Sequence, residues 1–196
     1  MKVLHVDASA LGDHSVSRRL TAAIVSGLER QHPGVSVTYR DVHAEPLDHW
    51  GLPGDKQDAA ALEDDKALQE FLDADVVVIG SPMYNFTISS SLKAWIDRIA
   101  VAGKTFRYTA SGPEGLAKGK RVIVGLSRGG MYPAGSPAGA MDFQEPYLRT
   151  LFGFLGVTDV AFVRAEGLAL GDEHKARAID AALADVDRVV ALSRAA

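Results

Sequence analysis

The sequence contains no cysteine, and that absence removes several classes of chemistry at once. Disulfide bonds, zinc sites built on thiolates and cysteine nucleophiles are all excluded for its 196 residues. Long apolar runs are missing as well, since a stretch such as 76–79 is far shorter than the roughly 20 residues that a membrane-spanning helix needs. The opening segment, MKVLHVDASA, lacks the continuous apolar stretch of a signal peptide. We therefore expect a cytoplasmic protein that does not associate with membranes.

An excess of positive charge is also absent. The formal net charge is -4 at pH 7, whereas a nucleic-acid-binding protein is normally basic, so no nucleic-acid partner is expected. Neither G-x-G-x-x-G nor G-x-x-x-x-G-K-[ST] occurs, which argues against a dinucleotide fingerprint and against a nucleoside triphosphatase. No cluster of His, Asp and Glu has the spacing of metal ligands, so we expect no metal site.

Short runs rich in β-branched residues alternate with longer segments of helical periodicity. The predicted strands cover 3–6, 35–39, 75–80, 122–126 and 160–163, and the predicted helices cover 17–30, 58–72, 92–99, 147–155 and 175–192. The length suits one domain, residues 1–196. Strands that are each followed by a helix predict an α/β fold, a doubly wound five-stranded parallel sheet within three α/β/α layers. The long connections over 106–119 and 128–140 are expected to be functional loops.

Three serines follow the first predicted strand, at the edge of the sheet where ligands of such folds bind. Ser9 comes directly after the strand, and Ser15 and Ser17, with Val16 between them, lie at the start of a helix. Unpaired N–H groups and the helix dipole make such a start an anion site, to which hydroxyl groups add donors. Simple capping of the helix explains the same serines, so both interpretations remain open.

Two aromatic residues, Tyr84 and Phe86, follow the third predicted strand within the segment Met83, Tyr84, Asn85 and Phe86. A flat ring with polar edges, such as isoalloxazine, needs an apolar face and hydrogen-bond partners at its rim. Tyr84 and Phe86 are suited to the face, and Asn85 with nearby backbone amides is suited to the rim. The alternative is a loop whose aromatic side chains are buried in the core.

Two glycines follow the fourth predicted strand, within the segment Ser127, Arg128, Gly129 and Gly130. Glycine lets the backbone approach a flat ring closely. Together with Gly125, the segment also matches G-x-S-x-G, the nucleophile elbow of serine hydrolases, and His174 follows in the required order. An elbow needs a helix directly after the serine, whereas a loop rich in proline and glycine follows here. A serine hydrolase that uses Ser127 therefore remains an alternative, although the sequence predicts no helix directly after this serine.

Taken together, these segments resemble the FMN-dependent NADH-azoreductase family, which is related to quinone reductases of the DT-diaphorase type and to flavodoxins. The resemblance covers nearly the whole chain and is carried by 83–86, 92–98, 105–108, 112–115 and 127–130. It implies a flavodoxin-like fold. One departure is Ser89, where proline is expected at a helix start, and it should not affect the site.

The resemblance further implies tightly bound, non-covalent FMN, with NADH or NADPH as electron donor and a homodimer as the active form. Quinones would be reduced to hydroquinones and azo compounds to amines in a two-electron ping-pong cycle, with no catalytic side chain because the hydride chemistry belongs to FMN. A flavodoxin-like electron carrier is the other alternative. The FMN contacts that the resemblance implies are Ser9, Ser15, Val16, Ser17, Met83, Tyr84, Asn85, Phe86, Ser127, Arg128, Gly129 and Gly130.

Overall fold

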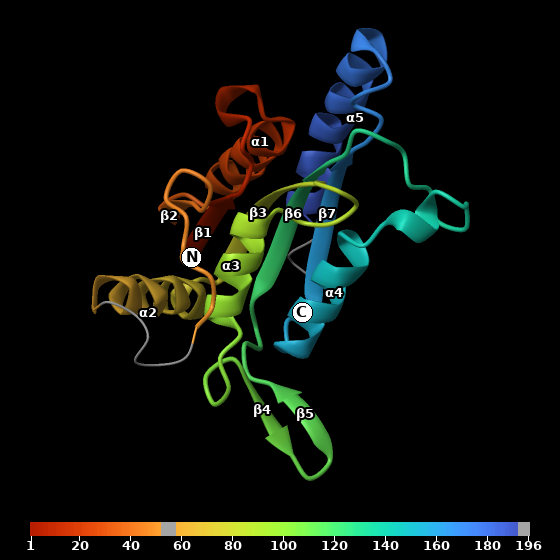
Figure 1. Cartoon of the computed structure of the whole chain (residues 1–196). Helices are drawn as coiled ribbons and strands as arrows, with labels where there is room; N and C mark the ends of the chain where they lie inside the picture. Colours follow the sequence, from red (N-terminus) through yellow and green to blue (C-terminus); the bar gives the residue numbers. More distant parts are fainter. Residues whose placement is uncertain (52–57, 192–196) are drawn as a thin grey trace.

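Five parallel strands form the central sheet of the computed structural model, which describes residues 1–51 and 58–191. Their spatial order is β2-β1-β3-β6-β7, so the chain reverses its direction of travel across the sheet between β1 and β3 (Figure 1). Ligands bind at the carboxyl ends of the strands beside such a reversal. The strands are β1 (Lys2–Asp7), β2 (Ser36–Asp41), β3 (Val76–Pro82), β6 (Arg121–Ser127) and β7 (Asp159–Ala165).

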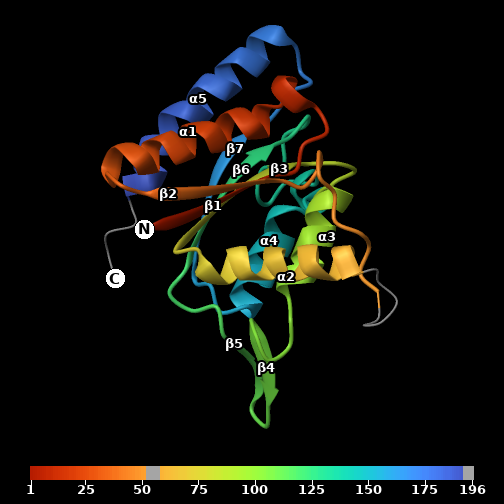
Figure 2. The ribbon, with the colours of Figure 1, turned by 90° about the vertical axis from the view of Figure 1, so that its left-hand side faces the viewer.

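Helices cover both faces of the sheet and complete the three predicted layers (Figure 2). One face carries α1 (Val16–Gln31) and α5 (Asp172–Ala191), which pack against each other. The other face carries α2 (Asp58–Asp73), α3 (Ser90–Ile99) and α4 (Glu145–Phe154), with short 3-10 helices at Gly12–His14 and Gly139–Met141 in the loops. The prediction of a doubly wound, flavodoxin-like α/β fold is confirmed. The last residue of the helix predicted over 175–192 lies outside the described residues.

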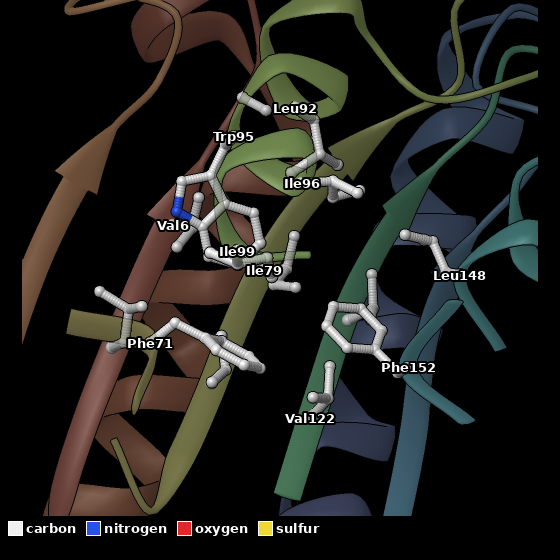
Figure 3. Packing of buried hydrophobic residues seen from close by; sticks show 14 of the residues in the cluster. Val6, Phe71, Ile79, Leu92, Trp95, Ile96, Ile99, Val122, Leu148 and Phe152 are labelled. Atoms are coloured by element: carbon white, nitrogen blue, oxygen red, sulfur yellow. The ribbon is translucent and has the colours of Figure 1, made fainter. Parts of the chain in front are cut away.

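Both faces of the sheet are buried at β3, which explains the continuous β-branched run of this strand. Every residue of β3 is buried. Val77 and Ile79 belong to the hydrophobic core under α2, α3 and α4, whereas Val76 and Val78 belong to the core under α1 and α5. Figure 3 shows the first of these cores, where Phe71, Trp95 and Phe152 are fully buried. Successive side chains of one strand thus hold two helical layers in place.

A β-hairpin occupies most of the segment that the sequence predicts to be a long loop. Its antiparallel strands are β4 (Phe106–Thr109) and β5 (Gly112–Gly115), and it projects from the end of the molecule opposite the carboxyl edge of the sheet (Figures 1 and 2). The ring of Phe106 packs on that of Phe154, with their centroids 4.7 Å apart. The prediction of a loop over 106–119 is therefore wrong. β5 has only four residues and both begins and ends with glycine, which is unfavourable in strands, so the sequence gives little indication of it.

Candidate functional site

The loops that follow β1, β3 and β6 meet at the carboxyl edge of the sheet. The backbone N–H of Met83 donates to the carbonyl of Ser127 across 2.8 Å, which continues the β3–β6 pairing into the loops. The Tyr84 hydroxyl accepts the Ala10 N–H at 3.0 Å and lies 3.5 Å from the Ser9 Oγ. The structure therefore brings together the three segments that the sequence selects separately.

The serines of the first loop lie at the N-terminus of α1. Ser15 is the N-cap residue, since its Oγ accepts the Arg18 N–H at 3.3 Å. Its Oγ also lies 3.1 Å from the Ser17 Oγ, and both side chains are buried. Ser15 thus caps the helix, whereas within residues 1–51 and 58–191 the Ser17 hydroxyl forms a hydrogen bond with the Ser15 hydroxyl alone and takes no part in the capping. Two hydroxyl groups side by side at a helix N-terminus form a suitable set of donors for an anion.

The turn after β3 has a strained backbone. Tyr84 and Thr87 exchange two backbone hydrogen bonds of 2.9 and 3.1 Å around Asn85 and Phe86, whose φ angles are 47° and 72°. Positive φ at both central residues defines a type I′ turn, which normally favours glycine or asparagine, and it costs free energy for a phenylalanine. Strain of this kind gathers at functional sites. The Phe86 side chain is 45% exposed, so the alternative of a loop with buried aromatics is wrong for this residue.

Two cavities flank Tyr84. One of about 540 Å³ lies on the side of Asn85 and Tyr147, and one of about 380 Å³ lies on the side of Ala10 and Ser89. Burial and the charge of a nearby carboxylate raise the pKa of the Tyr147 phenol to about 12, so this phenol stays protonated and can donate a hydrogen bond. Cavities of this size are typical of small-molecule sites.

Arg128 differs from the other predicted contacts, because its guanidinium is buried and bonded within the protein. Its Nε donates to the Gln144 Oε1 at 3.0 Å, its Nη1 donates to Glu166 at 2.9 Å, and its Nη2 lies 2.9 Å from an Asp142 oxygen. The amide of Gln144, itself fully buried, donates onward to the carbonyl of Ser81 at 2.9 Å. Arg128 therefore ties the end of β3, the loop after β6 and the start of α4 together.

The segment after β7 lies alongside the loop after β6, although no feature of the sequence points to it. The N–H of Arg128 donates to the carbonyl of Ala165, and N–H groups of 167–169 donate to the carbonyls of Arg128, Gly129 and Gly130 at 2.8–3.1 Å. Gly167 has a φ of 71°, and a Cβ there would lie 2.4 Å from the His174 ring, so this segment requires glycine. No motif marks this segment, because its role consists of backbone hydrogen bonds alone.

The nucleophile-elbow interpretation of Ser127 is wrong. No helix follows this serine directly, since the next α-helix along the chain begins at Glu145. His174 lies in the first turn of α5 beside Gly167, and within 1–51 and 58–191 no hydrogen bond joins it to the Ser127 Oγ. A serine nucleophile needs its histidine within hydrogen-bond reach.

A cluster of charged and polar side chains lies beneath the first loop. Arg18 bonds Asp41 at 2.6 Å, and the Tyr39 hydroxyl donates to the buried Asp7 at 3.2 Å. Burial, followed by the charges of Asp7 and Asp41, raises the pKa of Tyr39 to about 12, so its hydroxyl remains a donor.

The part of the chain that the structure describes holds no group of three metal-ligating side chains, and none of its helices is long and apolar enough to cross a membrane.

Comparison with known proteins places the chain first by its fold. A family profile for the flavodoxin-like fold matches residues 1–190. The chain is 59% identical over 190 residues to an FMN-dependent NADH:quinone oxidoreductase of Sinorhizobium fredii, covering 91% of this chain and 92% of that one. Among solved structures, an azoreductase of Bacillus anthracis strain Sterne superposes with a TM-score of 0.86 at 32% identity, covering 97% and 98% of the two chains.

A further solved structure bears on the cofactor. An FMN-dependent NADH-azoreductase of Bacillus anthracis strain Ames Ancestor, in complex with FMN, superposes with a TM-score of 0.87 at 25% identity, covering 97% of this chain and 98% of that one. The chain therefore belongs to the FMN-dependent NADH:quinone oxidoreductase and azoreductase family.

Proposed function

We propose that this protein uses NADH to reduce quinones to hydroquinones and azo compounds to amines, with FMN bound at the carboxyl edge of its sheet. One observation carries the assignment to this edge. The buried hydroxyl pair at the start of α1, the strained turn at 84–87 and the glycine segment 127–130 all lie there. One hydrogen bond joins Met83 to Ser127, and another joins Tyr84 to Ala10 in the loop that leads to α1. We assign the FMN contacts to the residues predicted from the sequence, with Arg128 acting through its neighbours.

The donor set fits a phosphate monoester. Ser15 and Ser17 offer hydroxyl groups, and the first turn of α1 offers backbone N–H groups on the positive end of the helix dipole. The fit to the ring rests on the segments after β3 and β6. Type I′ geometry leaves the peptides of Asn85 and Phe86 at the tip of their turn, and Gly129 and Gly130 allow close backbone approach.

When bound, FMN supplies the two-electron redox chemistry. The chain binds and orients, and no side chain needs to act as a nucleophile. Exposed apolar side chains from two loops lie near the turn: Phe86 itself, and Phe143, whose backbone N–H donates to the Phe86 carbonyl at 3.0 Å. An apolar border of this kind favours flat aromatic substrates without selecting one of them, in keeping with both quinones and azo compounds.

We also propose that the whole chain is one domain and that two copies form a homodimer with a site shared between them. Phe86 and Phe143, which are exposed beside the proposed flavin site and joined by a backbone hydrogen bond, support a dimer that covers this edge of the molecule. Light scattering on the purified protein should return twice the mass of one chain. A monomer with full activity would contradict this part of the proposal.

The function itself is tested with the purified protein. It should be yellow, the cofactor released by acid should run as FMN on chromatography, and NADH should be consumed when menadione is added. An electron carrier would instead need a protein partner before any turnover is seen. A protein that takes up no flavin on reconstitution, or only FAD, would contradict the proposal.

A further inference from the structure

Arg18 lies one helical turn beyond Ser15 in α1, and its guanidinium reaches back to the loop after β1. Nη2 donates to the carbonyl of Ser9 at 2.9 Å. Nη1 donates to Asp41 at 2.6 Å and to the Tyr39 hydroxyl at 3.0 Å. These bonds join the loop after β1, the start of α1 and the end of β2, so one side chain connects three separate segments at the site.

Two carboxylates surround this guanidinium. Asp41 is in direct contact, and the Oδ2 of the buried Asp7 lies 3.9 Å from Arg18 Nη1. Asp7 is itself held in place, because Thr21 donates to one of its oxygens at 2.9 Å and Tyr39 to the other at 3.2 Å. Two backbone N–H groups also donate to Asp41, and His5 Nε2 lies 3.3 Å from Asp7 Oδ2. Without the guanidinium, the start of α1 would face these two carboxylates with no arginine beside them, which opposes the binding of an anion there.

We propose that Arg18 is a positioning residue for the phosphate end of FMN, an inference that rests on the proposed function. It holds the Ser9 loop against the helix start that carries Ser15 and Ser17, and it compensates the carboxylates behind them. Both of its terminal nitrogens donate to protein acceptors, which is why we assign it this indirect role. Its Nε is buried and has no hydrogen-bond partner within the described ranges, so direct donation to the phosphate is the competing role.

Comparing FMN with riboflavin isolates the phosphate, since the two flavins differ only in that group. The dissociation constant of each flavin is measured by quenching of flavin fluorescence, on apoprotein of the wild type and of Arg18→Gln, Arg18→Lys and Arg19→Gln. Arg19 is exposed on the same helical turn, so Arg19→Gln makes the same change in net charge without touching the cluster. Thermal unfolding of each apoprotein checks that it is folded.

We expect Arg18→Gln to reduce the preference for FMN over riboflavin by about tenfold or more, the effect of losing charge-assisted hydrogen bonds, while Arg19→Gln keeps it. Arg18→Lys should lose the preference as well, because an ammonium group cannot hold Asp41 and the Ser9 carbonyl together as the guanidinium fork does. Restoration of the preference by lysine would show that a positive charge is sufficient and that the fork joining Asp41 to the Ser9 carbonyl is not needed, and it would overturn the positioning role.

The remaining outcomes separate this inference from the proposed function. A wild type that binds riboflavin as tightly as FMN would show that the phosphate site itself is wrong. A wild type that prefers FMN, with Arg18→Gln folded and the preference intact, would overturn the role of Arg18 and leave the function standing.

Discussion

Arg128 and Gln144 are joined by a 3.0 Å hydrogen bond between two almost completely buried side chains. The bond connects the loop after β6 to the residue that precedes α4, and the Gln144 amide continues to the Ser81 carbonyl at the end of β3. Carboxylates of Glu166 and Asp142 complete the surroundings of the guanidinium. A buried polar network therefore links the two loops proposed to bind the flavin ring.

Replacing Arg128 by methionine should destabilise the apoprotein by roughly 3 kcal/mol. The change leaves Glu166 and Asp142 without their cation, and breaking a buried ion pair costs about 3–5 kcal/mol, less where the carboxylates are partly exposed. Urea unfolding measures the effect. The control is Arg30→Met, which removes a surface ion pair to Asp187 and should cost less than about 1 kcal/mol. Equal effects of the two substitutions would contradict a structural role for Arg128.

Ser15 and Ser17 should behave differently when each is replaced by alanine. Ser15→Ala removes the N-cap and should cost the apoprotein about 1 kcal/mol, whereas Ser17→Ala leaves the cap in place. The double variant should bind FMN at least about tenfold more weakly while still folding, since donors to a charged group are lost. Flavin titration and thermal unfolding measure the two effects. Unchanged FMN affinity in the double variant would mean that the serines serve only the helix.

The turn at Phe86 offers a test of its strained backbone. Glycine adopts the observed φ of 72° freely, whereas alanine retains the penalty of a Cβ, so Phe86→Gly should be roughly 1 kcal/mol more stable than Phe86→Ala. Both variants lose an exposed aromatic ring at the proposed substrate face, and the KM for quinone should rise in both. Denaturant unfolding and steady-state kinetics give the two values. Greater stability of the alanine variant would show that the turn is not strained.

Ser127→Ala distinguishes flavin chemistry from ester hydrolysis. As a residue of a binding loop, Ser127 should be replaceable with a modest loss of FMN affinity or turnover. If Ser127 were a nucleophile, its replacement would instead lower the turnover by several orders of magnitude. Activity with menadione, and labelling of the wild type by a fluorophosphonate, are the measurements. An esterase activity that the substitution abolishes would restore the hydrolase interpretation.

The fold could be predicted from the sequence because its strongest signals are local. The run over 76–79 is β-branched throughout because both of its faces are buried, and the period of α1 follows from the single apolar face that it packs on the sheet. The hairpin at 106–115 could not be predicted in this way. Its strands are short, and Gly115 is required by the close approach of Gly156, which is distant in sequence.

The candidate site divides along the same line. Segments next to strand ends, such as 83–86 and 127–130, can be predicted from their place after a strand together with their aromatic and glycine residues. Arg18 and Gln144 cannot be predicted in this way, because their partners lie far away in the sequence or in other loops. Arg18 bonds to Asp41, and Gln144 bonds to Ser81 and Arg128. The sequence shows which residue types are present, but only the folded structure shows which side chains contact one another.

The reaction cycle gives the last prediction. Nothing in the sequence resembles a second nucleotide-binding motif, and the strained turn with Phe86 borders one proposed flavin face. NADH and the acceptor should therefore use the same space in turn. Steady-state plots with NADH and a quinone should give parallel lines, and each substrate in excess should inhibit competitively against the other. NADH alone should bleach the visible flavin absorption stoichiometrically, and menadione or an azo dye added afterwards should restore it in a separate step. Intersecting lines, together with no bleaching by NADH alone, would indicate a ternary complex and a second site, and the single-site cycle would have to be abandoned.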